Sequence, residues 1–444
     1  MSKGLAVWMN GQFVGVWSVD RGGHRFSYQA SWLRSPQRRA LSLSVPITPA
    51  GEVRGEAVEN YFENLLPDNK TIRERLARRH KTSSIEAFAL LEAIGRDCVG
   101  AVQLLPEGVE PLGWDRIDSD PLTDSQVAKV LRAVPSERML GQVPAEELFR
   151  ISLAGAQEKT ALLRHNGQWR RPQGATPTTH ILKLPMGLIG GSRRVDFSDS
   201  VANEWLCAKI LYHLGLPVAP TEMWRFEDQQ VLVVTRFDRS WQKHPDGRDW
   251  IARLPQEDFC QALGYPPSKK YEKDRGPGIK DCMRLLAGSS DKDDRASFAI
   301  TQLTFWLMAA TDGHAKNYSV FLQPGDAYIT TPLYDVLSVF PYVGTGPNQF
   351  TWRKAELALS LRSKNAHYRL YDIQARHWHG LAMQYGGPAV WQRMLIHVER
   401  VEAALKAVEQ TLPADFPQRT WRLISKGMRG QVLQFRSGLL DLPT

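Results

Sequence analysis

The chain has 444 residues, of which 43% are hydrophobic and 23% are charged. This length exceeds what one hydrophobic core ordinarily supports, so we expect two or three domains. No apolar run approaches the roughly 18 residues that a membrane span needs, and the start of the chain contains no continuous apolar segment. The composition therefore argues against a membrane protein, and we expect a cytoplasmic one.

The formal net charge of +9 indicates an acidic partner such as a nucleic acid. The Lys and Arg residues are scattered along the chain, however, so charge alone predicts only weak, salt-sensitive attraction. The four cysteines are far apart and form no C-x-x-C pair, which argues against disulfides and a zinc site (Cys98, Cys207, Cys260 and Cys282).

Residues 1–140 predict a compact α/β domain without a catalytic constellation. The turn Asn10-Gly11 stands between two apolar runs and predicts a β-hairpin. The predicted capping boxes pair Ser83 with Glu86 and Thr123 with Gln126. Further strands are expected at 24–29, 41–47 and 99–105, and helices at 57–66, 71–79, 87–94 and 123–134. The domain is either a docking or regulatory module or an extension of the next domain along the chain.

Residues 141–237 carry the first signs of a ligand site. Residues 150–163 predict a strand, a turn of small residues at 154–156 and a second strand, a geometry that lets backbone N–H groups approach phosphates. Glu158 stands where a Walker A motif needs a glycine, so this is not a P-loop, and taken alone a structural hairpin is the better interpretation. Strands are also expected at 179–185 and 231–234.

Lys183 and Glu204 suggest an ion pair. Lys183 shares a strand face with Ile181, and a lone Lys in that position is usually an edge residue. Glu204, however, falls on the apolar face of a predicted helix at 201–215, where an acid needs a cation. A strand Lys paired with a helix Glu is the arrangement that protein kinases use beside ATP.

Beyond residue 238 the chain is predicted to be mainly helical. Helices are expected at 256–263, 280–287, 295–310, 388–409 and 421–440, and irregular segments at 268–279 and 344–353. The helix at 295–310 is apolar on nearly every side and should be buried. Asp312, His314, Lys316 and Asn317 therefore emerge directly from a core element, where charge rarely stands without a partner or a task.

A hairpin and a second acid come after this group. The hairpin is expected to join residues 318–322 and 327–330, and Asp335 stands shortly after it. Either Asp312 or Asp335 alone is better explained as a surface acid. Together with Asn317 they reproduce the order that kinases use, in which one Asp orients the substrate hydroxyl and an Asn and a second Asp bind metal ions.

These blocks resemble the HipA family, the serine/threonine-kinase toxins of HipA–HipB type II toxin–antitoxin systems. The similar blocks are residues 152–163, 176–185, 236–239, 253–258, 276–278, 310–317 and 334–335, with 64–68 and 94–101 in the N-terminal region. The resemblance implies an α/β N-terminal domain (1–140), a kinase N-lobe (141–237) and a mainly α-helical C-lobe (238–444) in a two-lobed kinase-like fold.

The resemblance also implies roles for single residues. Asp312 would be the catalytic base, Asn317 and Asp335 would hold Mg²⁺, Lys183 would bind the ATP phosphates and Ser152 would be autophosphorylated. The other ATP-binding residues implied are Ala154, Gly155, Ala156, Gln157, Glu158 and Lys159 in the loop, Thr235, Arg236 and Phe237 in the hinge, and His314, Ala315, Lys316, Asn317, Tyr334 and Asp335. Thr235 replaces an acid of the family, with little effect expected because hinge contacts are largely backbone.

The family's partners are implied in the same way. The substrate would be an aminoacyl-tRNA synthetase, with glutamyl-tRNA synthetase as the first expectation, and a HipB-like helix-turn-helix antitoxin dimer would join the protein on operator DNA. Residues 367–376 and 419–429 are candidate basic stretches for that complex. Two alternatives stay open, namely a catalytically silent corepressor and a small-molecule kinase. A metal hydrolase is weaker, because no second His stands at ligand spacing.

Overall fold

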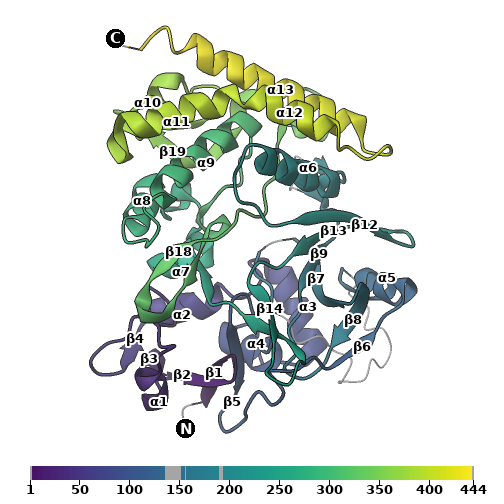
Figure 1. The fold of residues 1–444 in the computed structure, drawn as a ribbon, viewed down its shortest axis with the longest axis vertical. Helices are drawn as coiled ribbons and strands as arrows, with labels where there is room; N and C mark the ends of the chain where they lie inside the picture. The colour runs from purple at the N-terminus through teal and green to yellow at the C-terminus, as the bar shows by residue number, and fades with distance from the viewer. Residues whose placement is uncertain (1–2, 136–151, 156, 190–193, 443–444) are drawn as a thin grey trace. The chain divides into compact units, whose positions relative to one another are not determined.

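The computed structural model describes residues 3–135, 152–155, 157–189 and 194–442 (Figure 1). The chain forms two compact units. Unit 1 contains Met1–Leu184, Trp224–Ser268 and Ser319–Tyr328, and unit 2 contains Pro185–Met223, Lys269–Tyr318 and Ile329–Thr444. Within the described residues no helix is both long and apolar enough to cross a membrane.

Unit 1 begins with a five-stranded antiparallel sheet in the order β4-β3-β2-β1-β5. Asn10 and Gly11 both have positive φ (45° and 76°), as the tight turn between the first two strands requires, which confirms the predicted hairpin. Trp17 stacks on Phe62 of a covering helix at a centroid distance of 3.9 Å. The elements are β1 (Lys3–Met9), β2 (Gln12–Asp20), β3 (Gly23–Tyr28), α1 (Ala30–Arg34), β4 (Glu52–Arg54), α2 (Glu56–Glu63), α3 (Lys70–His80), α4 (Ala87–Ile94) and β5 (Val102–Pro106).

Two predictions for this region are wrong. Residues 41–47 form no strand beyond a single bridge between Ser42 and Val45, because the N–H groups of Leu41 and Leu43 bond to side chains of Tyr28 and Glu257. Ser83 does not cap α4, since the N-cap is Glu86, whose own side chain makes no capping hydrogen bond.

The second sheet of unit 1 has six strands in the order β12-β13-β9-β7-β8-β6. The helix α5 (Asp124–Ala133) packs Val127 and Leu131 against Trp169 and Phe226 of this sheet, and its capping box of Thr123 with Gln126 is confirmed. The strands are β6 (Ser119–Pro121), β7 (Lys159–His165), β8 (Gln168–Pro172), β9 (His180–Lys183), β12 (Thr221–Phe226) and β13 (Gln229–Thr235), and a separate ribbon pairs β14 (Arg239–Lys243) with β15 (Asp249–Arg253).

The strand predicted before the small-residue turn is absent from residues 152–154, and residues 150 and 151 lie outside the described residues. Ser152 bonds through its N–H to the Asp97 carbonyl, and the Gly155 carbonyl accepts the Asp68 N–H. This segment therefore joins the N-terminal region instead of pairing with β7.

The predicted hairpin at 318–330 is confirmed as β17 (Ser319–Leu322) and β18 (Tyr328–Thr330), and a third strand, β16 (Gln256–Asp258), pairs with β17. The helix predicted at 256–263 is thus shorter than expected. Only α7 (Phe259–Leu263) is helical, because the preceding residues pair with a strand and Asp258 caps the helix.

Unit 2 is mainly helical, with two short ribbons. Figure 1 shows α12 and α13 side by side, and both carry one apolar face. The helix predicted at 388–409 is two helices that meet at Arg400. The elements are β10 (Gly187–Ile189), β11 (Val195–Phe197), α6 (Ser200–His213), α8 (Ile279–Leu286), α9 (Asp294–Met308), β19 (Glu356–Arg362), β20 (Ala366–Arg369), α10 (Ala375–Tyr385), α11 (Gly387–Glu399), α12 (Val401–Glu409) and α13 (Gln418–Ser437).

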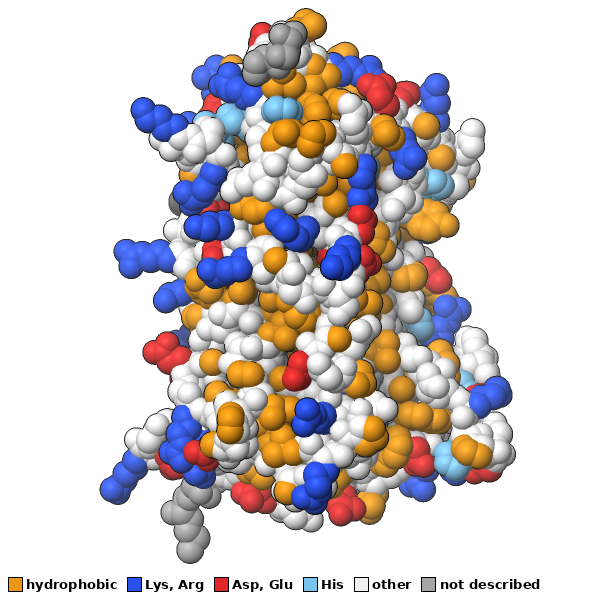
Figure 2. Space-filling view, turned by 60° about the vertical axis from the view of Figure 1, so that its left-hand side comes forward, with side chains coloured by type: hydrophobic (Ala, Val, Ile, Leu, Met, Phe, Trp, Pro, Cys, Tyr) orange, Lys and Arg blue, Asp and Glu red, His pale blue; other side chains and the backbone are white. Residues whose placement is uncertain are grey.

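Figure 2 shows the side-chain types on one face of the molecule. On the face drawn in Figure 2, Lys and Arg side chains are spread out and interspersed with acidic and hydrophobic ones.

Candidate active site

The loop that carries Asp312 begins where a buried helix ends. α9 stops at Ala309, which has a left-handed backbone (φ 50°), and the Ala310 N–H donates to the Phe305 carbonyl at 2.8 Å. A Cβ at Gly313 would lie 2.5 Å from the Phe305 ring, closer than a side chain tolerates. Glycine is therefore needed here, and it brings Asp312 against the end of the core helix.

Asn317 closes this loop. Its side-chain Nδ2 donates to the Asp312 carbonyl at 2.7 Å, and the same carbonyl accepts the His314 N–H at 2.8 Å. The amide is thereby fixed with its donor end inward, so Oδ1 is the end available to a ligand. The structure brings Asp312 and Asn317 together as the sequence predicts.

The Asp312 carboxylate is 60% exposed and lies beside two aromatic rings. The Tyr271 hydroxyl donates to its Oδ1, and Nε2 of His314 lies 3.9 Å from the same oxygen. Tyr271 also packs edge-on against the His314 ring at 4.8 Å, and the Ala315 N–H donates to the Lys270 carbonyl. Sequence analysis missed Tyr271, which lies in a segment predicted only as irregular.

The pKa of His314 is influenced by four charged side chains. Burial lowers the pKa of His314, the carboxylates of Asp312 and Asp335 act to raise it, and the ammonium groups of Lys270 and Lys316 act to lower it. Two acids and two lysines thus act on one neutral imidazole. Because perturbed titratable groups cluster at functional sites, this loop is a candidate for one.

Asp335 is held in a left-handed backbone conformation with φ 60°, which a non-glycine residue adopts at a cost of about 1 kcal/mol or more. Before it, the Leu333 N–H donates to the Pro217 carbonyl at 2.8 Å. After it, the Asn203 side chain of α6 accepts the Ser338 N–H at 3.0 Å and donates to its carbonyl at 2.8 Å. Asn203, whose anchoring role the sequence did not reveal, fixes the segment that presents Asp335.

Tyr334, which precedes Asp335, contacts the loop of residues 312–317, because its hydroxyl donates to the Lys316 carbonyl at 2.9 Å. The amide oxygen of Asn317 and the carboxylate of Asp335 are the hard oxygen ligands that Mg²⁺ prefers, and Mg²⁺ sites in kinases need only one or two carboxylates besides phosphates and water. The residues present therefore fit Mg²⁺.

The small-residue loop of unit 1 lies beside two lysines. A Cβ at Gly155 (φ 105°) would lie 2.7 Å from the Nζ of Lys159, so the ammonium sits directly over the loop backbone. Lys159 and Lys183 are register partners on β7 and β9, which places both side chains on one face of the sheet. The structure thus brings the two predicted phosphate-binding lysines together.

The rest of the loop is tied to its surroundings. The Gln157 side chain donates to the Leu184 carbonyl at 2.7 Å, and Arg75 of α3 forms an ion pair with Glu158. Ala154 is part of the described loop, whereas Ala156 lies outside the described residues.

Ser152 is fully buried. Its hydroxyl donates to the Leu65 carbonyl at 2.6 Å and its N–H donates to the Asp97 carbonyl at 3.2 Å. In this conformation the hydroxyl is out of reach of any enzyme.

The predicted hinge comes directly after β13. Phe237 packs edge-on against Phe321 of β17 at 5.8 Å. The Arg236 N–H donates to the Thr179 carbonyl at 2.9 Å, and its guanidinium lies in a buried ionic network. A nucleotide could therefore meet Arg236 only through the carbonyl oxygen, while Thr235 ends the strand with a partly exposed side chain.

That network is centred on Asp97, which the sequence did not single out. Asp97 lies 2.9 Å from Arg239, 3.2 Å from Arg253 and 3.4 Å from Arg236, and all are buried. Burial alone would raise the pKa of Asp97, but the three guanidinium groups outweigh it and hold the pKa well below its usual range. The network joins the N-terminal region to the start of the hinge.

Lys183 and Glu204 are both buried, in unit 1 and unit 2 respectively. Their ion pair stays a prediction.

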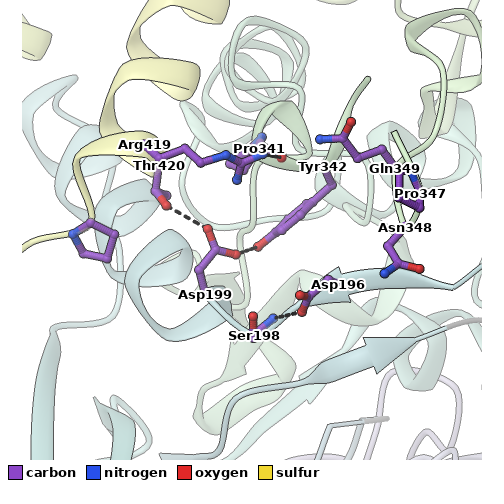
Figure 3. Close-up of a pocket in the computed structure, with 11 residues that line it drawn as sticks. Asp196, Ser198, Asp199, Pro341, Tyr342, Pro347, Asn348, Gln349, Arg419 and Thr420 are labelled. Carbon is purple, nitrogen blue, oxygen red and sulfur yellow. Dashed lines mark hydrogen bonds between the residues drawn. The ribbon is translucent and has the colours of Figure 1, made fainter. Parts of the chain in front are cut away.

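A cavity of about 390 Å³ in unit 2 contains none of the predicted site residues (Figure 3). Asp199 lies at its wall and accepts hydrogen bonds from Tyr342 at 2.6 Å and Thr420 at 2.7 Å. Burial and the nearby carboxylate raise the pKa of Tyr342. The cavity wall thus carries a structural hydrogen-bond network and is separate from the candidate site.

A pair of sheet lysines and an Asp, Asn and Asp in this order are typical of kinase-like proteins, and comparisons identify the family. Residues 151–415 match the model of the HipA-like C-terminal domain, and residues 5–105 match that of the HipA N-terminal domain. The chain therefore belongs to the HipA family of serine/threonine-kinase toxins.

Relatives and a solved structure support this assignment. Y4mE of Sinorhizobium fredii is 32% identical over 92% of each chain. The serine/threonine-protein kinase toxin HipA of Shewanella oneidensis is 28% identical over 76% of each chain. The fold is similar to that of HipA in a Shewanella oneidensis complex of HipA, HipB and operator DNA, with a TM-score of 0.78, 24% identity, and coverage of 99% of this chain and 100% of that one. The fold is thus HipA-like, with an α/β N-terminal region and a mainly α-helical C-terminal lobe in a two-lobed kinase arrangement.

Proposed function

We propose that this protein is an ATP- and Mg²⁺-dependent serine/threonine protein kinase that acts as the toxin of a toxin–antitoxin pair. The observation that carries the proposal is the loop from Asp312 to Asn317, in which one carbonyl fixes the Asn317 amide while Asp335 lies close enough to act on His314. Kinases place their hydroxyl-orienting and metal-binding residues in this order.

In the proposed reaction Asp312 accepts the hydrogen of the substrate hydroxyl. Its carboxylate is exposed to an incoming protein, and the Tyr271 hydroxyl on Oδ1 restricts its rotation and leaves Oδ2 for the substrate. Mg²⁺ bound by Asn317 and Asp335 would offset the charge of the transferring phosphoryl group. Lys159, Lys183 and Lys316 would contact the ATP phosphates, and the neutral imidazole of His314 can donate one hydrogen bond without adding charge.

We further propose Ser152 as the site of autophosphorylation. Because its hydroxyl is buried against the Leu65 carbonyl, transfer requires the segment to leave this position first. A phosphate carries two negative charges and cannot return beside a carbonyl oxygen, so modification would keep the loop displaced and weaken ATP binding.

The proposed partners are those of the family. Support for a HipB-like antitoxin dimer and for operator DNA comes from the similar Shewanella protein, whose solved complex contains HipB and its operator DNA. With them the protein would corepress its operon and associate with the nucleoid in the bacterial cytoplasm. The proposed substrate, an aminoacyl-tRNA synthetase and first of all glutamyl-tRNA synthetase, rests on the family resemblance alone; its phosphorylation would arrest growth and give persistence.

One experiment tests this proposal together with two alternatives, a catalytically silent corepressor and a small-molecule kinase. Purified protein is incubated with Mg²⁺ and γ-labelled ATP, with and without glutamyl-tRNA synthetase, beside the variants Asp312→Asn and Ser152→Ala. Asp372→Asn, which changes an exposed acid of unit 2, is the matched control.

We expect label on the synthetase and on the protein itself, no label with Asp312→Asn, and loss of self-labelling alone with Ser152→Ala. ATP binding without label on any protein would favour a silent corepressor, and label on a metabolite from a cell extract would favour a small-molecule kinase. Activity that survives Asp312→Asn would overturn the proposed mechanism.

A further inference from the structure

A segment of the N-terminal region, residues 38–44, holds the turn of the β17–β18 hairpin. The Ala40 N–H donates to Oδ1 of Asp326 at 2.7 Å, and the Gly325 N–H donates to the Arg38 carbonyl at 3.0 Å. We call residues 38–44 the clamp segment. Asp326 has a positive φ of 64°, so the turn is folded back with its carboxylate directed at the clamp segment.

Arg39 makes the second contact. Its side chain is almost fully buried, and its Nη1 donates to the carbonyl of Leu322, the last residue of β17, at 3.1 Å. Its Nε and Nη2 donate to the Gln37 carbonyl, and its own carbonyl accepts the Trp32 indole N–H at 3.0 Å. Burying a charged guanidinium carries a large desolvation cost. The hydrogen bond of Arg39 to the end of β17 therefore indicates that a fixed position of this strand end matters.

Glu257 makes the third contact. It is fully buried on β16, where it pairs with Val320 of β17, and its Oε1 accepts the Leu43 N–H at 2.8 Å. The clamp segment therefore bonds to the hairpin turn, to the end of β17 and to the strand beside β17.

Residues 319–328 of the hairpin belong to unit 1, whereas the rest of the chain from residue 269 to its end belongs to unit 2. Asn317 precedes the hairpin by two residues and Asp335 comes five residues after it. The covalent chain therefore connects this hairpin to both proposed metal ligands over at most five residues.

We propose that the clamp segment positions Asn317 and Asp335 for Mg²⁺, with Arg39, Asp326 and Glu257 as positioning residues. This inference rests on the proposed kinase function and extends it, because it assigns the N-terminal region a part in metal binding. A purely structural role would lower the melting temperature of variants but would leave the Mg²⁺ requirement unchanged.

The test uses a pair of variants at Asp326. Asp326→Gly removes the acceptor of the Ala40 N–H yet tolerates a φ of 64°, whereas Asp326→Asn keeps both the acceptor and the tolerance for this backbone. The matched control is Asn166→Gly, which changes another positive-φ residue, in the β7–β8 turn. Arg39→Met serves as a second variant that keeps the apolar stem and loses the donor.

For each variant we would measure Mg²⁺-dependent ATP binding by calorimetry and the Mg²⁺ concentration that gives half-maximal phosphate transfer. We expect Asp326→Gly and Arg39→Met to raise that concentration about threefold or more, and Asp326→Asn and Asn166→Gly to leave it near the wild-type value. Folded variants with an unchanged Mg²⁺ dependence would overturn the inference, even if their melting temperature falls. A wild type that binds ATP and Mg²⁺ but transfers no phosphate would instead contradict the proposed function. In that case the calorimetric data alone would show whether the clamp segment affects Mg²⁺ binding.

Discussion

Lys159 and Lys183 lie directly opposite each other on the antiparallel strands β7 and β9. Like charges directly opposite each other on neighbouring strands repel. Gly155 brings the loop backbone against the Lys159 ammonium, on the sheet face that also carries Lys183. This arrangement supports the proposal that the two lysines bind the phosphates of ATP.

We therefore predict that Lys159→Met and Lys183→Met each weaken ATP binding about tenfold or more, which corresponds to about 1.4 kcal/mol. Isothermal titration calorimetry in Mg²⁺ measures this directly. The double variant should lose less than the sum of the single losses, because both lysines would contact the same bound phosphates. Lys280→Met, at an exposed position of α8, is the control, and full affinity in both single variants would contradict the assignment.

Removing the charge of Asp97 should lower the free energy of unfolding more than removing the charge of an exposed acid. Asp97→Asn leaves three buried guanidinium groups with one carboxylate, Asp238, and we expect a loss of about 3 kcal/mol or more in the free energy of unfolding. The control is Glu402→Gln, which breaks an exposed pair with Arg429 and should cost below about 1 kcal/mol. Urea unfolding followed by fluorescence compares the two, and equal losses would show that the network adds little.

Local sequence patterns predicted the parts of the fold whose causes are local. Asn10-Gly11 gave the correct turn because both positions need positive φ, and Thr123 with Gln126 gave the correct cap because the partners are three residues apart. The hairpin before Asp335 and the proximity of Asn317 to Asp312 were predicted for the same reason.

Contacts between distant residues explain what the sequence could not show. Asp97 and Arg239 are 142 residues apart, and Tyr271 and Asp312 are 41 apart, so no spacing rule connects them. β16 was mistaken for part of a helix because pairing with β17 outweighs its local preference. The roles of the site residues, including the pair of Lys183 with Glu204, stay predictions.

Glu257 should make stability depend on pH. Burial raises the pKa of Glu257 to about 8, whereas in the unfolded chain the carboxyl loses its proton near its ordinary pKa. Between these values the unfolded state binds fewer protons, so the free energy of unfolding falls as pH rises, by up to about 1.4 kcal/mol per pH unit. The groups that face the carboxyl are the Leu43 N–H, the Ser42 hydroxyl and the ionisable side chains of Tyr28, Tyr61 and Asp258.

Glu257→Gln keeps the acceptor of the Leu43 N–H and removes the titration. We expect the variant to lose less stability than the wild type between pH 5 and pH 8, the range that the raised pKa defines. Urea midpoints at several pH values measure the difference. Parallel curves for the two proteins would show that Glu257 is not the group responsible.

Ser152 offers a test of the loop itself that does not require catalysis. Ser152→Ala loses only the hydrogen bond to the Leu65 carbonyl, so we expect a cost of about 1 kcal/mol in stability and nearly unchanged ATP affinity. Ser152→Asp places a carboxylate against that carbonyl in a fully buried position, which should displace the segment and lower ATP affinity about tenfold or more. Calorimetry gives the affinities, and limited proteolysis of the region around residue 152 reports the displacement. Equal ATP affinity in the Asp and Ala variants would mean that the position of Ser152 does not control the nucleotide loop.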